Sequence, residues 1–345
     1  MSYVAFITGV TGQDGSYISE LLLHKGYFVV GLRRKTTVNN LLHINHLLNH
    51  PNFTLRYGDM CDANSLINII HDIKIQFPNL ERLEVYNLAG LTHVGLSFDM
   101  PELTANVNAL GPLRLLEAIR KSGYSDKIRF YQASTSELFG KVEEIPQTEE
   151  TKLQPRSPYA CSKLFSHWIT KNYREAYGLY ACSNICMNHE GERRDPLFVT
   201  RKITMGLADI LAGKTDKLIL GNINASRDWG HAKDFVRGMW MTLQQNEPDD
   251  FVLSTGMTHT VREFIEKAFK LKGFEIQWKG TGFDEIGYDK NTGRELIFIS
   301  EDFFRPAEVD FLLGDSSKAK KILGWEIEYN FDDLVKMMVE HDCGK

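Results

Sequence analysis

Residues 3–15 read YVAFITGVTGQDG, an apolar run that leads directly into a turn with three glycines. The run is short and continuous, which is typical of a strand covered on both faces. A helical pattern of apolar residues then extends to Gly26, and a second apolar run follows at 27–32. This order of strand, glycine-rich turn, helix and strand predicts the unit that opens a dinucleotide-binding sheet.

The glycine-rich turn is the first predicted binding element. We expect Gly9 to make the tight turn, Gly12 to let a diphosphate approach the backbone, and Gly15 to let the helix pack closely. The spacing is G-x-x-G-x-x-G, whereas G-x-G-x-x-G is more common. A plain turn is the alternative, but this turn lies between a strand and a helix. It also contains three further expected cofactor contacts, Thr11, Gln13 and Asp14.

The end of the second apolar run bears on the choice of dinucleotide. An acidic residue there would accept a hydrogen bond from the ribose 2′-hydroxyl of NAD, whereas arginine would bind the 2′-phosphate of NADP. The sequence offers Arg33 and Arg34, followed by Lys35. The pattern therefore favours NADP, with a solvated basic loop as the alternative.

Apolar runs and helical patterns continue to alternate through the first half of the chain. We expect strands at 53–57, 83–89, 128–134 and 180–187, with helices between them at 63–74, 102–122 and 158–177. This alternation predicts an α/β fold with a doubly wound, Rossmann-type parallel sheet. Ligands bind beyond the carboxyl ends of such strands. Cofactor contacts are therefore expected after the third and fourth strands, from Asp59, Met60, Leu88, Ala89 and Gly90.

The stretch 157–163, SPYACSK, carries the expected chemistry. With a helix starting at the proline, Tyr159 and Lys163 lie four residues apart on one face. An ammonium group beside the phenol would lower the pKa of Tyr159 and make it a candidate acid/base. The same pair also occurs by chance in many helices, as a half-buried ring beside a lysine. We expect three other residues of this helix to point into the core: Leu164, Trp168 and Ile169.

Composition limits the classes of function. The chain has 345 residues, of which 43% are hydrophobic and 25% charged, and its formal net charge is −5. We therefore expect an ordinary globular protein that binds neither nucleic acid nor membranes. The five cysteines form no C-x-x-C pair, so we expect no metal site and a reducing, cytoplasmic location.

The regular alternation ends near residue 190. We expect residues 1–188 to form the dinucleotide-binding domain, with residues 228–256 returning to it. Residues 189–227 and 257–345 are expected to form a smaller α+β lobe that holds the substrate over the cofactor.

Several motifs in a specific order resemble the extended short-chain dehydrogenase/reductases, most closely their GDP-mannose 4,6-dehydratase branch. The matching stretches include GVTGQDGSY, YQASTSELFGKV, PRSPYACSK, RDWGHAKDF and RPAEVD, and they cover nearly the whole chain. The resemblance implies a Rossmann domain with a nucleotide-sugar lobe, bound NADP and a homodimer or homotetramer. It also implies conversion of GDP-D-mannose to GDP-4-keto-6-deoxy-D-mannose.

The resemblance assigns roles to individual residues. Tyr159, helped by Lys163 and Thr135, would take the proton of the 4-hydroxyl while C4 gives hydride to the cofactor. Glu137 would then remove the C5 proton and protonate the departing 6-hydroxyl, before hydride returns to C6. His189 and Arg194 would contact the cofactor. The expected substrate contacts are Thr92, Asn188, Lys202, Arg227, Arg305 and Glu308.

The sequence also departs from the family pattern. Residues 190–194 read EGERR where the family usually has ESPRR, and residues 90–93 read GLTH in place of AQSH. Other functions stay open, namely a dehydratase, epimerase or reductase of another nucleotide sugar, and a nucleotide sensor without turnover. Further reduction of the 4-ketone by NADPH is a second activity that this chemistry allows.

Overall fold

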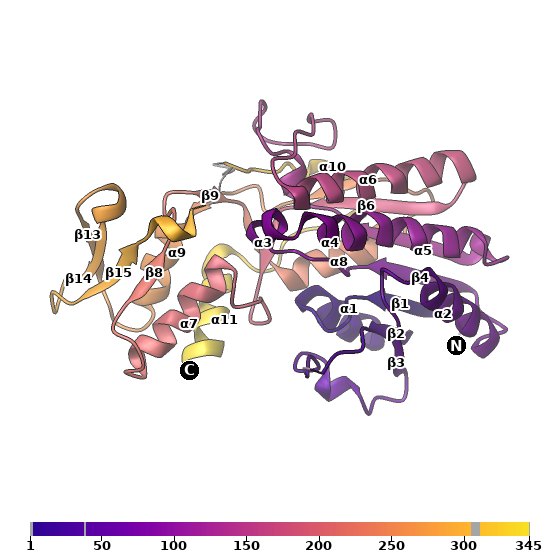
Figure 1. The fold of residues 1–345 in the computed structure, drawn as a ribbon, viewed down its shortest axis with the longest axis horizontal. Helices are drawn as coiled ribbons and strands as arrows, with labels where there is room; N and C mark the ends of the chain where they lie inside the picture. Colours follow the sequence, from indigo (N-terminus) through magenta and orange to yellow (C-terminus); the bar gives the residue numbers. More distant parts are fainter. Residues whose placement is uncertain (1–2, 38, 305–310, 345) are drawn as a thin grey trace.

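The computed structural model describes residues 3–37, 39–304 and 311–344 and has a larger and a smaller lobe (Figure 1). Arg305 and Glu308, expected from the sequence to bind substrate, lie outside the described residues. Within those ranges, no helix combines the length and the apolar character needed to cross a membrane.

The larger lobe is built on one parallel sheet with the order β11-β6-β5-β4-β1-β2-β3. Chain order reverses between β1 and β4, which is where ligands bind in a Rossmann-type fold. The predicted α/β class is therefore confirmed. The strands are β1 (Tyr3–Thr8), β2 (Phe28–Arg33), β3 (Phe53–Tyr57), β4 (Arg82–Asn87), β5 (Ile128–Ala133), β6 (Tyr180–Cys186) and β11 (Phe251–Leu253).

Helices cover both faces of this sheet (Figure 1). One apolar core lies under α1 (Gln13–His24), α8 (Ala232–Thr242) and α10 (Ser317–Leu323). The other lies under α2 (Ala63–Gln76), α5 (Gly111–Arg120) and α6 (Pro158–Tyr177). The inner strands are thus buried from both sides, which is why their sequences are largely apolar rather than alternating, whereas the edge strand β3 is partly exposed.

The helix predicted at 102–122 is not uniform. It forms as α4 (Pro101–Ala105), a single π-helical segment η2 (Asn106–Leu110) and then α5, and it follows the short helix α3 (Val94–Asp99). A π-helical segment inserts extra backbone into a helix and often marks a functional site.

Trp168 does not point into the core as predicted. Its ring is 52% exposed, while Leu164 and Ile169 are half-buried. Buried positions in α6 include Ser162, Ser166 and Thr170, whose small side chains let this helix lie close to its neighbours. The apolar residues of α6 thus lie on two faces of the helix, and one of these faces is on the protein surface.

The smaller lobe has a mixed sheet, β13-β14-β15-β8, packed on three helices (Figure 1). Its strands are β8 (Leu218–Leu220), β13 (Ile276–Lys279), β14 (Ile286–Asp289) and β15 (Glu295–Ile299), and its helices are α7 (Val199–Leu211), α9 (Val261–Lys270) and α11 (Phe331–Cys343). Two short ladders complete the strands: β7 (Asn188–Glu190) with β10 (Trp229–His231), and β9 (Ser226–Arg227) with β12 (His259–Thr260).

The chain returns to the larger lobe after visiting the smaller one. β11 forms the edge of the large sheet beside β6. Trp325, which is fully buried, packs its ring edge-on against Phe235 of α8, and its indole Nε1 donates to the carbonyl of Asp234 at 2.8 Å. The core of the larger lobe therefore contains residues from both ends of the sequence.

Candidate active site

Polar side chains join the carboxyl ends of the three central strands. The Thr8 hydroxyl donates to Asn87 Oδ1 at 2.6 Å, and Asn87 Nδ2 donates to Gln132 Oε1 at 2.7 Å. The backbone amides of Leu88 and Ala89 each donate to the Thr8 hydroxyl at 3.1 Å. These buried bonds fix the loop that contains the predicted cofactor contacts Leu88, Ala89 and Gly90.

Two positions of the glycine-rich turn have no room for a side chain. Gly9 has a φ of +69°, and a Cβ there would lie 2.8 Å from the backbone of Leu88 and Ala89. A Cβ on Gly15 would lie 2.1 Å from the Gly9 carbonyl oxygen. Gly12 occupies the N-cap of α1 and has no side chain with which to cap it. The N-terminus of α1 is therefore left open toward an anion.

The chemistry-bearing pair lies in the first turns of α6. Ser157 caps this helix, because its hydroxyl accepts a hydrogen bond from the Ala160 amide at 3.0 Å. Tyr159 and Lys163 are both buried, with 7% and 5% exposure. Lys163 Nζ donates to the Ala133 carbonyl at 2.9 Å and lies 6.0 Å from the centroid of the Tyr159 ring.

Thr135 and Glu137 meet the same pair from the end of β5. Thr135 begins the short 3₁₀ helix η4 (Ser136–Leu138), where its hydroxyl accepts from the Glu137 amide at 3.3 Å. The Thr135 side chain also lies close enough to the phenol of Tyr159 to lower the pKa of that phenol. Glu137 is 9% exposed, and its charge acts on Tyr159. The four residues predicted to be catalytic thus lie at one strand end.

The pKa of Tyr159 differs from the expected direction. Burial raises the pKa of Tyr159 to about 12, the hydrogen bond from Thr135 lowers it, and the charge of Glu137 raises it again. Burial also lowers the pKa of Lys163 to about 8. The expected lowering of the Tyr159 pKa by Lys163 is wrong for the chain by itself, because the ammonium is bonded to a backbone carbonyl and the phenol is desolvated.

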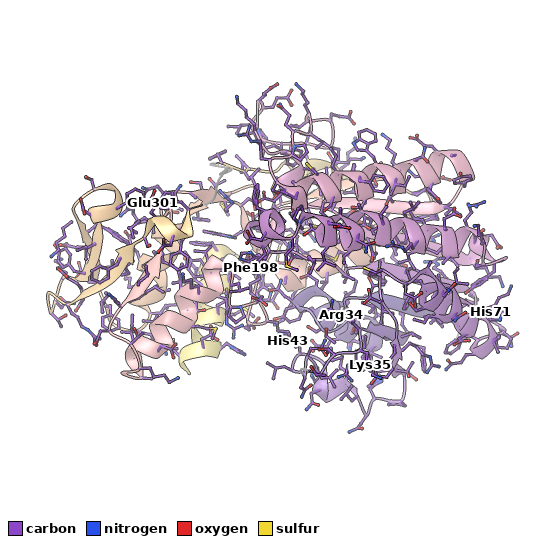
Figure 2. All side chains as sticks on the ribbon, in the orientation of Figure 1. Arg34, Lys35, His43, His71, Phe198 and Glu301 are labelled. Atoms are coloured by element: carbon purple, nitrogen blue, oxygen red, sulfur yellow. The ribbon has the colours of Figure 1, made fainter. Side chains whose placement is uncertain are left out.

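His189 and Arg194 reach the glycine-rich turn from β7 and the loop after it. His189 Nε2 lies 2.9 Å from Asp14 Oδ2, and Gln13 Nε2 donates to the His189 carbonyl at 3.1 Å. Arg194 Nε lies 2.9 Å from Glu190, and its guanidinium carbon lies 3.6 Å from the centroid of the Phe198 ring. Figure 2 places Phe198 where the two lobes meet.

The other predicted cofactor residues lie at the ends of β2 and β3. Arg33 Nε is buried without a hydrogen-bond partner among the described residues, and Arg34 is exposed (Figure 2). Asp59 Oδ1 accepts from the Cys61 amide at 2.9 Å. Met60 is buried against Gly111, where an added Cβ would lie 3.0 Å from the Met60 side chain.

Predicted substrate residues come mainly from the smaller lobe and the connections to it. Asn188 Oδ1 is buried, with no partner in the part of the chain that the structure describes. Lys202 Nζ lies 3.3 Å from the centroid of the Phe303 ring, and burial lowers the pKa of Lys202. Arg227 is buried and donates to the Ser226 carbonyl at 2.9 Å. Thr92 is exposed beyond β4.

Two residues near the carboxyl ends of the strands were not predicted from the sequence. Asn108, in the π-helical segment, accepts from the Leu91 amide at 2.8 Å and donates to the Leu91 carbonyl at 2.9 Å. Its signal was a polar amide inside an apolar helical pattern. Glu192, at one of the departures from the family pattern, accepts from the Tyr17 hydroxyl at 2.6 Å and pairs with the buried His231 at 3.2 Å. Glu192 thereby ties the loop after β7 to α1 and α8.

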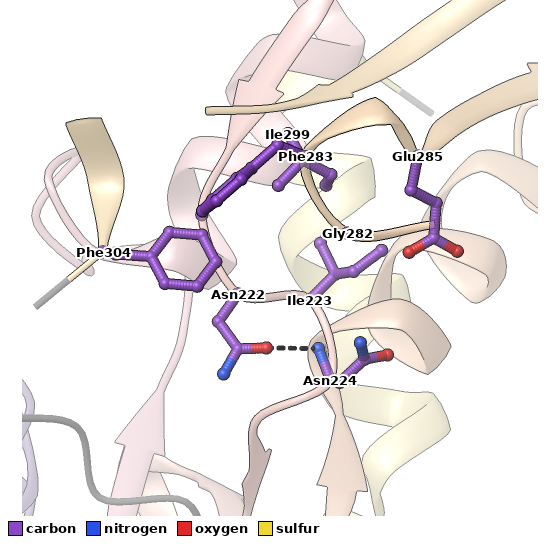
Figure 3. A pocket seen from close by; sticks show the side chains of 9 residues that line it. Asn222, Ile223, Asn224, Gly282, Phe283, Glu285, Ile299 and Phe304 are labelled. Carbon is purple, nitrogen blue, oxygen red and sulfur yellow. Dashed lines mark hydrogen bonds between the residues drawn. The ribbon is translucent and has the colours of Figure 1, made fainter. Parts of the chain in front are cut away.

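A cavity of about 250 Å³ lies in the smaller lobe, away from the residues predicted to be catalytic (Figure 3). Ile223, Phe283, Ile299 and Phe304 give it apolar walls, and Asn222 at its edge accepts from the Asn224 amide at 3.0 Å. None of Thr135, Glu137, Tyr159 and Lys163 lines it.

The sheet order, the glycine-rich turn and the Tyr-Lys pair on α6 define a Rossmann-type α/β protein with a tyrosine and a lysine at the ends of its strands. A family model described as GDP-mannose 4,6 dehydratase matches residues 6–338. The chain belongs to this family.

Relatives and solved structures agree with this assignment. The chain is 52% identical to a GDP-mannose 4,6 dehydratase of Dictyostelium discoideum, covering 98% of this chain and 95% of the relative. It is 49% identical to the Homo sapiens GDP-mannose 4,6 dehydratase, covering 98% and 91%. A dTDP-glucose 4,6-dehydratase from Bacillus anthracis has a TM-score of 0.78 at 22% identity, covering 98% of this chain and 96% of that structure. At that identity the likeness concerns the fold.

Proposed function

We propose that this chain converts GDP-D-mannose to GDP-4-keto-6-deoxy-D-mannose with bound NADP. One observation supports the proposal most directly. Tyr159, Glu137 and Lys163 are buried, and they lie together with Thr135 at the end of one strand. Oxidation of an alcohol needs an acid/base, and elimination of water needs a second group that can take a proton from carbon. The relatives named GDP-mannose 4,6 dehydratase point to the substrate.

The residues present fit a dinucleotide. A Cβ at Gly9 or Gly15 would collide with backbone, so only glycine permits this tight turn beside α1, and Gln13 Oε1 is buried without a partner among the described residues. NADP is proposed over NAD because Arg33 ends β2 and Arg34 follows it. When bound, the dinucleotide supplies a hydride acceptor for C4 and later the hydride for C6.

The chain's own residues then move protons. Tyr159, in its ionised form, accepts the proton of the mannosyl 4-hydroxyl, with Thr135 beside its phenol and Lys163 behind it. The resulting 4-ketone acidifies the C5–H bond. Glu137 takes the C5 proton and delivers a proton to the 6-hydroxyl as water leaves. C5 takes up a proton again when hydride reaches C6. Lys202 and Arg227 provide the positive charge that a GDP diphosphate needs.

A product assay tests this function. Incubation of the enzyme with GDP-mannose and catalytic NADP⁺ should give a product lighter by one water, seen by mass spectrometry. Consumption of UDP- or dTDP-hexoses in place of GDP-mannose would overturn the substrate. Binding of nucleotide without any turnover would favour the sensor. Added NADPH would reveal reduction of the 4-ketone as a gain of two hydrogens.

Arg34→Ala is expected to weaken NADP⁺ binding about tenfold or more and to leave NAD⁺ binding nearly unchanged, because only NADP⁺ carries the 2′-phosphate that arginine would bind. Isothermal titration with each cofactor measures both constants. Lys336→Ala, which removes a positive charge from an exposed position of α11, is the matched control. Equal losses of NAD⁺ and NADP⁺ affinity in Arg34→Ala would contradict the phosphate role.

We also propose that the chain forms a homodimer through α6, as a first step toward any tetramer. Cys161, Phe165 and Trp168 lie at helical spacing on the outward face and are exposed. Exposed apolar residues of the adjacent α3 to η2 region extend this surface: Leu96, Met100, Leu103 and Leu110. Such a contiguous apolar surface is typical of an interface.

The five cysteines are all free, which supports a cytoplasmic location.

Trp168→Glu is expected to shift the assembly toward monomers, because the charge would be buried in the interface without a partner. Sedimentation velocity over a dilution series measures the shift. Ile322→Glu, at an equally exposed apolar residue of α10, should leave the assembly unchanged. A wild-type protein that sediments as a monomer would refute the dimer, and an unshifted Trp168→Glu dimer would refute this surface.

A further inference from the structure

His189 lies between the glycine-rich turn and the strand that leads into the smaller lobe. Its Nδ1 is 2.8 Å from the Met187 carbonyl oxygen, and its Nε2 is 2.9 Å from Asp14 Oδ2. The ring stacks on Phe235 of α8, with centroids 4.7 Å apart and an angle of 16° between the planes. The imidazole is therefore held from α1, α8 and the end of β6 at once.

Both ring nitrogens of His189 face oxygen atoms. A backbone carbonyl only accepts hydrogen bonds, and an ionised carboxylate also only accepts them. A neutral imidazole has a single N–H, so it would leave one nitrogen lone pair directed at an oxygen lone pair. The imidazolium form, with two N–H donors, satisfies both contacts. The geometry thus selects a positively charged His189.

The surroundings of Asp14 favour its ionised form. Gln13 Nε2 donates to the other carboxylate oxygen at 3.0 Å, and the positive charge of Arg194 acts on the same carboxylate. Burial raises the pKa of Asp14, but the charge and hydrogen bond of His189 with these neighbours outweigh burial and lower it. For His189, burial lowers the pKa, while the charge and hydrogen bond of Asp14 raise it above its ordinary value.

Asp14 occupies the first turn of α1, where the proposed cofactor brings its negative diphosphate. An uncompensated carboxylate in that turn would repel the diphosphate. The other charged and titratable groups on which Asp14 acts are Tyr159, Lys163, Tyr131 and Cys186, and the positive charge of Arg194 acts on His189. Among the described residues, His189 is the titratable group that contacts the carboxylate directly.

We propose that His189 is a positioning residue that carries a positive charge in the working enzyme and neutralises Asp14, so that the N-terminal turn of α1 can accept an anionic dinucleotide. This inference rests on the proposed function for the identity of the dinucleotide. It predicts that cofactor affinity is coupled to the protonation of His189. The charge is fully present below the ordinary histidine pKa and is lost as the pH rises through the raised value.

A double-mutant cycle on the intact, cofactor-stripped enzyme tests the coupling. His189→Gln leaves Asp14 without its cation and should weaken NADP⁺ binding about tenfold or more, the scale of one charge-assisted hydrogen bond. Asp14→Asn removes the charge that needs neutralising, so adding His189→Gln in that background should cost much less. Equal losses in both backgrounds would overturn the proposal, since His189 would then act without Asp14. Circular dichroism checks that each variant is folded.

The pH dependence supplies a second readout. Between about pH 6 and pH 10, wild-type affinity for NADP⁺ should fall as His189 and Lys163 lose their protons, and the part of this fall that His189 contributes should be absent from His189→Gln. Superimposable profiles of the two proteins would contradict the proposal.

Histidine-selective ¹⁵N NMR observes the ring without any cofactor or turnover. The signal that disappears in His189→Gln should show two protonated nitrogens at neutral pH, and a neutral tautomer there would overturn the inference. This measurement needs neither NADP⁺ nor GDP-mannose. The charge of His189 can therefore be tested even if the proposed dehydration is wrong.

Discussion

Tyr159→Phe is expected to lower kcat for GDP-mannose by about 10²–10⁴-fold, the usual contribution of a positioned acid/base. The substitution removes the phenolic oxygen beside Thr135 and keeps the ring that is buried in the first turn of α6. Without that oxygen, no group in this position takes the proton of the 4-hydroxyl, and C4 cannot be oxidised. Single-turnover absorbance of reduced nicotinamide should therefore be lost together with product.

The matched control for this variant is Tyr131→Phe. Tyr131 is also a buried tyrosine, on the neighbouring strand β5, and its hydroxyl lies 3.8 Å from the Cys186 sulfur. Loss of that hydroxyl should change stability more than kcat. A Tyr159→Phe enzyme that retains more than about a tenth of the wild-type kcat would exclude Tyr159 as the acid/base.

Glu137→Gln is expected to stop the reaction at the elimination of water, which follows the oxidation at C4. Glutamine has nearly the same shape but cannot accept the C5 proton, so formation of the 4-keto-6-deoxy product should fall by about 10²–10⁴-fold. Oxidation at C4 should survive, and reduced nicotinamide should still form in a single turnover. In deuterated water, exchange of deuterium into C5 should be lost. This pattern separates Glu137 from Tyr159, whose loss removes both steps.

Glu143→Gln provides the control, because it makes the same chemical change in the exposed segment after η4. Its rate and its deuterium exchange should match those of the wild type. If Glu137→Gln still exchanged deuterium at C5 at the wild-type rate, the elimination base would have to be another residue.

The fold could be predicted because its signals are local. Each strand of the large sheet is a short apolar run, and each is followed by a turn or a helical pattern, so the order of elements could be inferred from periodicity. Strand ends were predictable for the same reason, and parallel strands place those ends at one edge. Thr135 and Tyr159 were therefore expected near one another although 24 positions separate them in the chain.

Other features depend on distances that no local pattern contains. The pKa of Tyr159 follows from how deeply the phenol is buried and from Lys163 bonding to Ala133, and both need the packed structure. The pair of Asp14 and His189 joins positions 175 apart. Trp168 was assigned to the core because its spacing is helical, but spacing alone does not say which of two apolar faces meets solvent.

Trp325 and β11 imply that neither lobe can be excised as a continuous fragment. A truncation near residue 190 would remove the edge strand β11, together with α8. A truncation near residue 300 would leave a hole beside Phe235, where the Trp325 indole belongs. Fragments that end near residue 190 or near residue 300 should therefore aggregate, and limited proteolysis of the intact protein should release no stable half.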